Sequence, residues 1–358
     1  MAKRHTVKLI EVSGSDSSIG ERLGRSCRTT ARQMLRDGQA RWRARGVDWE
    51  RNIANSLRYL PYAEDYSPRY MDMIRGYARG SGLRFEDVFA MIYEGETFGC
   101  TDIAVNEEAT ADGSVLSAHT EDWWTTYEDQ LVLVNVRPKT GPSFLATSYG
   151  GLELLGGINS SGVSLTINSL TQNDMRVGVP RVLFAFEVLV SKTLGDALNA
   201  CTPEDRASGY NYNICHKSGE MYCVEVSAMA HSLLYPSGGY MVHTNHYLHP
   251  KMARYEAIFD ETVEPNRGYS TGSIVRCNRA WRLLENSLGE IDLETLFSIQ
   301  KDHVNLPHSI CCHAEAHAPK PLRWKTIFSV VYDLKKGSIW LGTGNPCDTT
   351  RVEYRLAK

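Results

Sequence analysis

The chain has 358 residues, of which 42% are hydrophobic and 23% charged, a composition typical of globular proteins with one large domain or two average ones. The formal net charge is -3, with Lys and Arg spread along the chain, so we expect no nucleic-acid partner. No apolar run is long enough to cross a bilayer and no apolar stretch follows the charged start, so we expect no membrane segment and no secretory signal. The nine cysteines form an odd, unpatterned set, which favours reduced thiols and a cytoplasmic location.

Residues 16 to 98 follow helical patterns after one short strand. The strand is expected over 7–12, and helices are expected over 19–24, 28–45, 49–60, 68–82 and 85–93, with a break at Pro61. Gly20 and Gly24 lie on one face of the first helix. Because neither carries a side chain, this face allows close packing against a neighbouring element.

From Cys100 onward the pattern changes to strands and turns. Strands are expected over 114–118, 130–136, 143–148, 152–158, 163–167, 210–215, 221–226, 233–235, 240–244, 326–334 and 338–342, and helices over 180–198, 273–288 and 293–301. The run from Asn159 to Gly162 predicts a hairpin turn. This order of elements predicts an α+β fold in which helices enclose two sheets.

The step from Gly99 to Cys100 lies where the two patterns meet. Glycine lets the backbone twist at a bond that is to be broken, and the cysteine sulfur can attack the same carbonyl. After a cut at this bond, Cys100 carries both a thiol and a free α-amino group, which supply a nucleophile and a general base. A buried structural cysteine is the alternative interpretation of the dipeptide alone.

Several short motifs follow one another in a fixed order over nearly the whole chain. They are Gly14 to Gly24, Gly99-Cys100-Thr101, Asp122-Trp123, Gly156 to Val163 with its continuation to Leu170, His243 to His246, Asp302-His303 to Cys311, and Gly344 to Cys347. Together they resemble the acyl-coenzyme A:6-aminopenicillanic acid acyltransferase family of N-terminal nucleophile (Ntn) hydrolases.

The resemblance implies a four-layer αββα fold of the Ntn-hydrolase type, self-cleavage before Cys100, and amide chemistry. It divides the chain into a helical segment, 1–99, and a nucleophile-bearing core, 100–358. The two segments form one structural domain and, once cut, an α/β heterodimer. The sequence departs from the family at His119-Thr120-Glu121, where the penicillin-pathway acyltransferase has Gln-Asn-Trp, so the substrate side of the site is expected to differ.

Two further residues are expected to act beside Cys100. Asn245 is the candidate for the oxyanion hole, because a carboxamide is a neutral donor for the charge that develops on a carbonyl oxygen. A turn asparagine is the alternative. Asp122 is expected to orient the Cys100 amine or to bind a cationic substrate group, and a turn-forming aspartate is the alternative.

The remaining candidates are expected to contact the substrate. Asn159 and Asn168 flank the predicted hairpin, where they either hold the amine of Cys100 or cap the turn. His119 and Glu121 precede Asp122. Arg323, together with the nearby Lys325, either meets a substrate carboxylate or forms a solvated basic pair.

A third group of residues suggests a metal. Histidines and cysteines gather at His303, His308, Cys311, Cys312, His313 and His317. Their spacing matches no recognised ligand set, so we expect no metal and no cofactor. A zinc-dependent hydrolase built on this cluster is one alternative function, and a binding module that kept the fold without processing is another.

The sequence thus predicts a self-processing cysteine amidohydrolase or acyltransferase that cleaves a small N-acyl amide through a Cys100 thioester. Hydrolysis is favoured over transfer because it needs fewer partners. The expected partner is a small amide or acyl substrate. A coenzyme A thioester is an open option, although the chain shows no glycine-rich phosphate loop.

Overall fold

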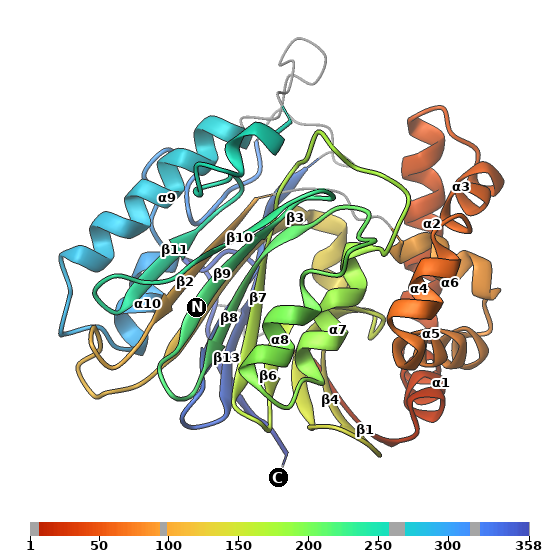
Figure 1. Ribbon diagram of the computed structural model, residues 1–358, viewed down its shortest axis with the longest axis horizontal. Coiled ribbons are helices and arrows are strands. Elements are labelled where there is room, and N and C mark those ends of the chain that lie inside the picture. The colour runs from red at the N-terminus through yellow and green to blue at the C-terminus, as the bar shows by residue number, and fades with distance from the viewer. Residues whose placement is uncertain (1–6, 94–98, 258–268, 316–322, 358) are drawn as a thin grey trace.

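The computed structural model describes residues 7–93, 99–257, 269–315 and 323–357. Two β-sheets lie face to face, and helices cover the outer face of each sheet (Figure 1). The α+β, four-layer αββα fold expected from the sequence is confirmed.

One sheet has eight strands in the order β1-β4-β5-β6-β7-β8-β9-β10, and the other has six in the order β11-β2-β3-β12-β13-β14. β1 runs parallel to β4, and the other paired strands are antiparallel. The strands are β1 (Lys8–Gly14), β2 (Cys100–Val105), β3 (Leu116–Trp124), β4 (Leu131–Pro138), β5 (Phe144–Tyr149), β6 (Glu153–Asn159), β7 (Val163–Ser169), β8 (Tyr210–His216), β9 (Met221–Val226), β10 (His231–Leu234), β11 (Tyr240–His243), β12 (Trp324–Asp333), β13 (Ser338–Thr343) and β14 (Val352–Arg355).

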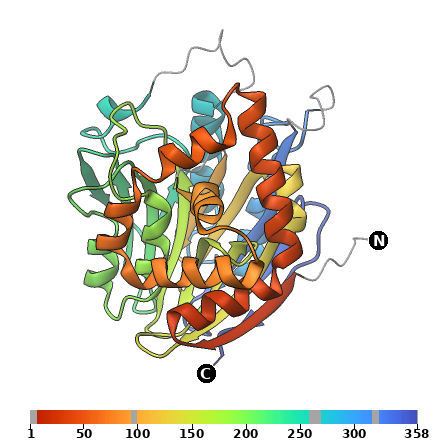
Figure 2. The ribbon, with the colours of Figure 1, turned by 90° about the vertical axis from the view of Figure 1, so that its right-hand side faces the viewer.

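The helices form two outer layers. They are α1 (Asp16–Ser26), α2 (Arg28–Ala44), α3 (Trp49–Ser56), α4 (Leu60–Tyr66), α5 (Pro68–Ser81), α6 (Phe85–Ile92), α7 (Phe184–Leu189), α8 (Leu194–Ala200), α9 (Tyr269–Glu285) and α10 (Leu293–Gln300). α1 to α6 gather on one side of the molecule, at the right of Figure 1 and facing the viewer in Figure 2. Within the described residues, no helix combines the length and the apolar character needed to cross a membrane.

Three apolar clusters separate the four layers. One joins α1, α5, α7 and α8 to the outer face of the eight-stranded sheet. The second lies between the sheets, where Leu133 and Leu145 meet Phe328 and Val330. The third packs α9 and α10 on the outer face of the six-stranded sheet. Sheets that are covered on both faces bury polar residues as well as apolar ones, and these polar residues form the site described below.

Two predicted helices are each divided in the structure. The helix expected over 49–60 ends at Ser56, and Pro61 lies in the first turn of a separate helix, α4. Proline is tolerated there because the first N–H groups of a helix have no partner within it. The helix expected over 180–198 gives way to α7 and α8, because Thr193 and Asp196 form a capping box that starts α8 anew.

Two strands were not predicted. β2 is buried at all six positions and so lacks the alternation of polar and apolar residues that marks a half-buried strand. β14 is short and partly exposed along its length. The missing β2 matters most, because this strand begins at Cys100.

The glycine face of α1 packs against α5 as the sequence predicted. A Cβ atom added at Gly20 would lie 1.8 Å from the carbonyl oxygen of Met73, and one at Gly24 would lie 2.3 Å from that of Tyr77. Gly76 and Gly80 of α5 are equally close to the backbone of α1. The two helices therefore touch backbone to backbone, and no side chain fits between them.

We expect Gly20→Ala to lower the free energy of unfolding by about 3 kcal/mol, because a methyl group must push two helix backbones apart. Gly38→Ala is the matched control: Gly38 lies inside α2, and its Cβ would meet the Trp49 ring at 3.7 Å and the end of the Arg41 side chain at 3.9 Å, both ordinary contact distances. The control should gain up to about 1 kcal/mol from better helix propensity. Urea unfolding measures both values, and equal effects of the two substitutions would contradict the close packing.

Candidate active site

Cys100 is the first residue of β2, which lies between β11 and β3 in the six-stranded sheet. Pairing with β3 places Cys100 opposite Glu121 and Asp102 opposite His119. Paired residues of antiparallel strands point to the same face, so these four side chains lie together between the sheets. All four are buried, and the side chain of Cys100 is 2% exposed.

Hydrogen bonds hold the peptide bond between Gly99 and Cys100 at both its carbonyl oxygen and its nitrogen. The backbone N–H of Asp122 donates to the carbonyl oxygen of Gly99 at 2.8 Å. The N–H of Cys100 donates to Oδ1 of Asn245 at 2.9 Å. Arg276 of α9 donates to the same Asn245 oxygen at 2.8 Å and to the carbonyl oxygen of Cys100 at 2.5 Å. The peptide group is therefore fixed by donors and acceptors that come from other parts of the chain.

Glu121 and His119 form a buried charged chain next to the sulfur. Oε2 of Glu121 lies 3.7 Å from Sγ of Cys100 and 2.8 Å from Nε2 of His119, and Nδ1 of His119 lies 2.5 Å from Oδ1 of Asp102. Burial alone would lower the pKa of His119, but the two carboxylates raise it to about 10. The ring is therefore an imidazolium between two carboxylates.

The same environment keeps the Cys100 thiol protonated. Burial and, after it, the carboxylate of Glu121 raise its pKa well above the usual value. A thiolate forms here only when the proton passes to a neighbouring group, and Oε2 of Glu121 is in contact with the sulfur.

Asp122 lies beside Gly99, the first residue of the Gly99–Cys100 peptide bond. Its Oδ1 accepts a hydrogen bond from Thr326 at 2.6 Å. Its Oδ2 is buried without a partner among the described residues, and a Cβ atom on Gly99 would lie 2.6 Å from it. Burial raises the pKa of Asp122 to about 7, against the opposing effect of Arg276.

A cavity of about 40 Å³ opens next to Cys100. It has room for a few water molecules. Acidic and aromatic side chains line much of it, among them Glu121, Glu153, Trp123 and Tyr149.

The structure gathers four predicted site residues at Cys100: His119, Glu121, Asp122 and Asn245. Asn168 is linked to this group through Asn213, which donates to both Asn168 and Asp102.

Asn159 and Arg323 lie elsewhere. The Asn159 side chain accepts from Ser161 and Val163 and donates to two backbone oxygens, which favours the hairpin-cap alternative. Arg323 precedes β12, where its carbonyl oxygen accepts from Thr125. Its neighbour Lys325 pairs with Glu128 at 2.8 Å.

Sequence reasoning missed three residues of this site. Arg276 lies on a helix whose pattern shows only an amphipathic face, and Thr326 lies inside a strand. Asp102 directly follows the Gly99-Cys100-Thr101 motif but was not among the predicted site residues. No spacing signal connects these positions, because their contacts arise from strand pairing and layer packing.

Two groups of side chains bring together three or more atoms of the kind that bind metals, within the described ranges. One is Cys100, His119 and Glu121, with ligand atoms within 4.8 Å of one another. Here both ring nitrogens of His119 already face carboxylates, so the ring acts as a hydrogen-bond donor.

The other group comprises His303, Cys311, His313 and Cys347. It contains three members of the predicted histidine and cysteine cluster. Of the rest, His308 pairs with Glu315, Cys312 points its sulfur at the His313 carbonyl, and His317 lies outside the described residues.

Two sheets between helical layers, with a buried cysteine opening a central strand, define the Ntn-hydrolase fold class. The family of acyl-coenzyme A:6-aminopenicillanic acid acyl-transferases matches residues 109–348, and with this match over more than half of its length the chain belongs to that family. The protein is accordingly an enzyme of the acyltransferase class. No curated protein sequence resembles the chain closely enough to count as a match.

Solved structures resemble it only distantly. The C2A mutant of conjugated bile acid hydrolase from Clostridium perfringens has 13% identity and a TM-score of 0.47, over 72% of this chain and 97% of that one. Penicillin V acylase from Agrobacterium tumefaciens has 15% identity and a TM-score of 0.41, over 68% and 83% of the two chains. Thermostable penicillin G acylase from Alcaligenes faecalis has 10% identity and a TM-score of 0.40, over 56% and 51%. Scores this low carry no weight for the site or its substrate.

Glu153 provides a test of the buried charge around the cavity. Burial and then the nearby Glu121 raise its pKa from 4.5 to about 7. Between these values the folded state binds more protons than the unfolded state, so this group lowers stability as pH rises. We expect the stability advantage of Glu153→Gln over the wild type to grow by about 2–3 kcal/mol from about pH 5 to pH 8.

Urea unfolding at a series of pH values measures this difference, and Glu290→Gln, at an exposed position, is the control that should show no such trend. A difference that does not change with pH would contradict the raised pKa of Glu153.

Proposed function

We propose that the protein is a self-processing cysteine amidohydrolase or acyltransferase, in which Cys100 becomes an N-terminal nucleophile and forms a thioester with the acyl part of a small N-acyl amide. The geometry of the Gly99–Cys100 bond carries this proposal. A backbone N–H of Asp122 already faces the carbonyl oxygen, and Oδ1 of Asn245 already holds the amide nitrogen. Donors fixed in advance at a carbonyl oxygen stabilise the oxyanion of acyl transfer.

Self-cleavage begins with attack of Sγ on the carbonyl carbon of Gly99. The oxyanion forms on the Gly99 oxygen, where the Asp122 N–H donates. The C–N bond then breaks, the nitrogen gains a proton and becomes the α-amine of Cys100, and the Gly99 acyl group is left on sulfur. Water hydrolyses this thioester, which releases the Gly99 carboxylate and restores the thiol.

Glu121 is the proton acceptor that we propose for this first reaction. In the intact chain the nitrogen of Cys100 is an amide and cannot act as a base, so another group must take the thiol proton. Glu121 has an oxygen 3.7 Å from the sulfur, and the His119 imidazolium on the same oxygen steadies it. This role extends the sequence prediction, which placed Glu121 and His119 on the substrate side.

The mature site uses the same residues differently. The new α-amine of Cys100 stays at Oδ1 of Asn245, and the unpartnered Oδ2 of Asp122 is the second acceptor that we propose for it. The Asn245 nitrogen carries two hydrogens, one of which donates to the Ser169 carbonyl at 3.1 Å. We assign the other to the substrate oxyanion, in line with the expected role of Asn245.

The cut chain is proposed to remain an α/β heterodimer of residues 1–99 and 100–358. The first segment supplies β1, which pairs with β4 over seven residues, and helix α1, which contacts both strands. Separation of the segments would therefore break a sheet and expose its apolar outer face.

The cavity supports hydrolysis over transfer, because it has room for a water molecule beside the sulfur. Its acidic residues, Glu121 and Glu153, favour an acyl group that carries a cationic or hydrogen-bond-donating group over the anionic phosphates of coenzyme A. Since the mechanism requires a reduced thiol and none of the nine cysteines forms a disulfide, we place the protein in the reducing cytoplasm.

The intact mass of the denatured protein tests self-cleavage. We expect two fragments from the wild type, one ending at Gly99 and one beginning at Cys100, because Asp122 and Asn245 already hold the carbonyl oxygen and the nitrogen of this bond. Cys100→Ala is the control and should stay uncut. An uncut wild-type chain would contradict the proposed mechanism and would favour a binding module that has kept the fold.

Glu121→Gln tests the proton acceptor. The amide keeps the size of the side chain but cannot accept the thiol proton, so we expect self-cleavage to slow by at least about 100-fold. Tyr149→Phe is the matched control: it removes a donor at 3.2 Å from the other Glu121 oxygen and leaves Oε2 in place, so it should slow cleavage far less. The time course of fragment formation on a gel measures both rates, with circular dichroism to confirm folding. A wild-type rate in Glu121→Gln would rule out this role.

A further inference from the structure

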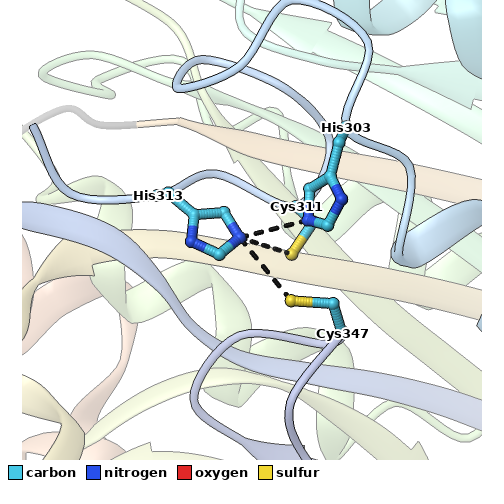
Figure 3. A group of neighbouring side chains, drawn as sticks. All are labelled: His303, Cys311, His313 and Cys347. Atoms are coloured by element: carbon cyan, nitrogen blue, oxygen red, sulfur yellow. Dashed lines mark hydrogen bonds between the residues drawn. The ribbon is translucent and has the colours of Figure 1, made fainter.

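Four side chains that the site at Cys100 does not use converge on one point (Figure 3). His303, Cys311 and His313 come from the segment between α10 and β12, and Cys347 comes from the connection between β13 and β14. Nε2 of His313 lies 3.1 Å from Nε2 of His303, 3.5 Å from Sγ of Cys311 and 3.6 Å from Sγ of Cys347.

Hydrogen bonds alone do not explain this arrangement. An imidazole nitrogen has one lone pair in the plane of its ring and can accept one hydrogen bond along it. Three neighbours surround the single nitrogen of His313, and each of them is also a common metal ligand. An ion between the four atoms would accept one lone pair from each of them.

The distances fit a tetrahedral ion. With bonds of about 2.0–2.1 Å to nitrogen and about 2.3 Å to sulfur, tetrahedral zinc separates two nitrogens by about 3.3 Å and a nitrogen from a sulfur by about 3.5 Å. The observed separations of 3.1 Å, 3.5 Å and 3.6 Å lie close to these values. Two thiolates also neutralise a divalent ion, which allows Cys311 to remain buried.

We propose that His303, Cys311, His313 and Cys347 bind one Zn²⁺ ion in a closed, structural site. All four coordination positions are filled by the protein, so none is left for the water molecule that a catalytic zinc site holds. The proposal replaces the expectation of no metal, which rested on sequence spacing alone, and it argues against the zinc-hydrolase alternative.

The surrounding backbone holds the ligands in place. The N–H of Cys311 donates to the carbonyl oxygen of Asp302 at 3.0 Å, and the N–H of His313 donates to that of Pro307 at 2.9 Å. The Asp302 carboxylate pairs with Arg279 of α9 at 2.8 Å. These contacts fold the segment back on itself, so that His303 and His313 face each other.

Asn345 contacts one of the four proposed ligands without being a ligand itself. Nδ2 of Asn345 donates to Sγ of Cys311 at 3.7 Å and to the carbonyl oxygen of Cys312 at 2.6 Å. Hydrogen bonds to ligand sulfurs orient metal ligands and tune their affinity. The same asparagine thus joins the connection that carries Cys347 to the segment that carries Cys311.

The ion would stabilise the position of Asp122 through Cys312, the residue that follows the ligand Cys311. The N–H of Cys312 donates to Oγ1 of Thr326 at 2.8 Å, and Thr326 in turn donates to Asp122 at 2.6 Å. By fixing Cys311, zinc fixes the neighbouring backbone on which this chain of hydrogen bonds depends.

Metal analysis of the purified, desalted protein tests the site directly. We expect one zinc per chain in the wild type and loss of bound zinc in Cys347→Ser and His303→Gln, both at exposed positions where substitution leaves the fold intact. His308→Gln is the matched control in the same segment, and Cys100→Ala is the control for the group at the nucleophile. Both should keep one zinc, and retention in Cys100→Ala separates this test from the fate of the proposed self-cleavage.

Two measurements on the wild type do not depend on whether the variants fold. Co²⁺ added to chelator-treated protein should give the thiolate charge-transfer and visible bands of a tetrahedral ion. Zn²⁺ should also protect the exposed Cys347 from iodoacetamide, as read by peptide mass spectrometry. Wild-type protein that holds no zinc and gives no such cobalt spectrum would overturn the proposal, as would a Cys311–Cys347 disulfide in freshly isolated protein.

Discussion

Charge buried between two sheets is the constraint on which the rest of this molecule depends. Asp102, His119 and Glu121 are buried, and their burial is tolerable because the His119 imidazolium lies between the two carboxylates. Loss of one partner from such a group leaves an uncompensated charge, at a cost of about 3–5 kcal/mol. Tyr149 and Asn213 donate to these carboxylates from the opposite sheet, so polar contacts as well as apolar packing fix how the two sheets face each other.

The same arrangement keeps the nucleophile inert until it is needed. A buried, protonated thiol reacts slowly with oxidants and with stray electrophiles. In the intact chain the Cys100 sulfur has one acidic neighbour within reach and a small, water-sized space beside it. Reactivity is thus limited to a proton transfer between defined atoms, which is the selectivity that an enzyme with eight other cysteines requires.

The sequence predicted the parts of the site that occur in recognisable motifs. Cys100, Asp122 and Asn245 were named from the family resemblance, and the structure places them around one peptide bond. Arg276 and Thr326 could not be found in this way, because they reach that bond through helix packing and strand pairing and belong to no local pattern. Asn159 illustrates the opposite case: its motif marked it as a candidate, but its side chain is occupied by the turn that it helps to form.

The sequence predicted those helices and strands whose polar and apolar residues follow a regular period. Alternating strands such as β1 and amphipathic helices such as α5 follow from periodicity. β2 did not, because a strand covered on both faces shows no alternation, and its polar residues are there for the site. The histidine and cysteine cluster shows the limit of spacing rules, since Cys347 comes from the connection between β13 and β14, far along the chain from the other three.

The position of β1 has a consequence for how long the enzyme lasts. This strand belongs to the segment before Cys100, yet it forms the edge of the eight-stranded sheet and covers β4. If the chain is cut as proposed, a molecule that later unfolds would release two separate pieces, one of them with a bare strand edge that tends to aggregate. Refolding would then be a bimolecular event in competition with that aggregation, so unfolding of the mature form would be irreversible. Its working lifetime would be set by the rate at which it unfolds and not by an equilibrium between folded and unfolded states.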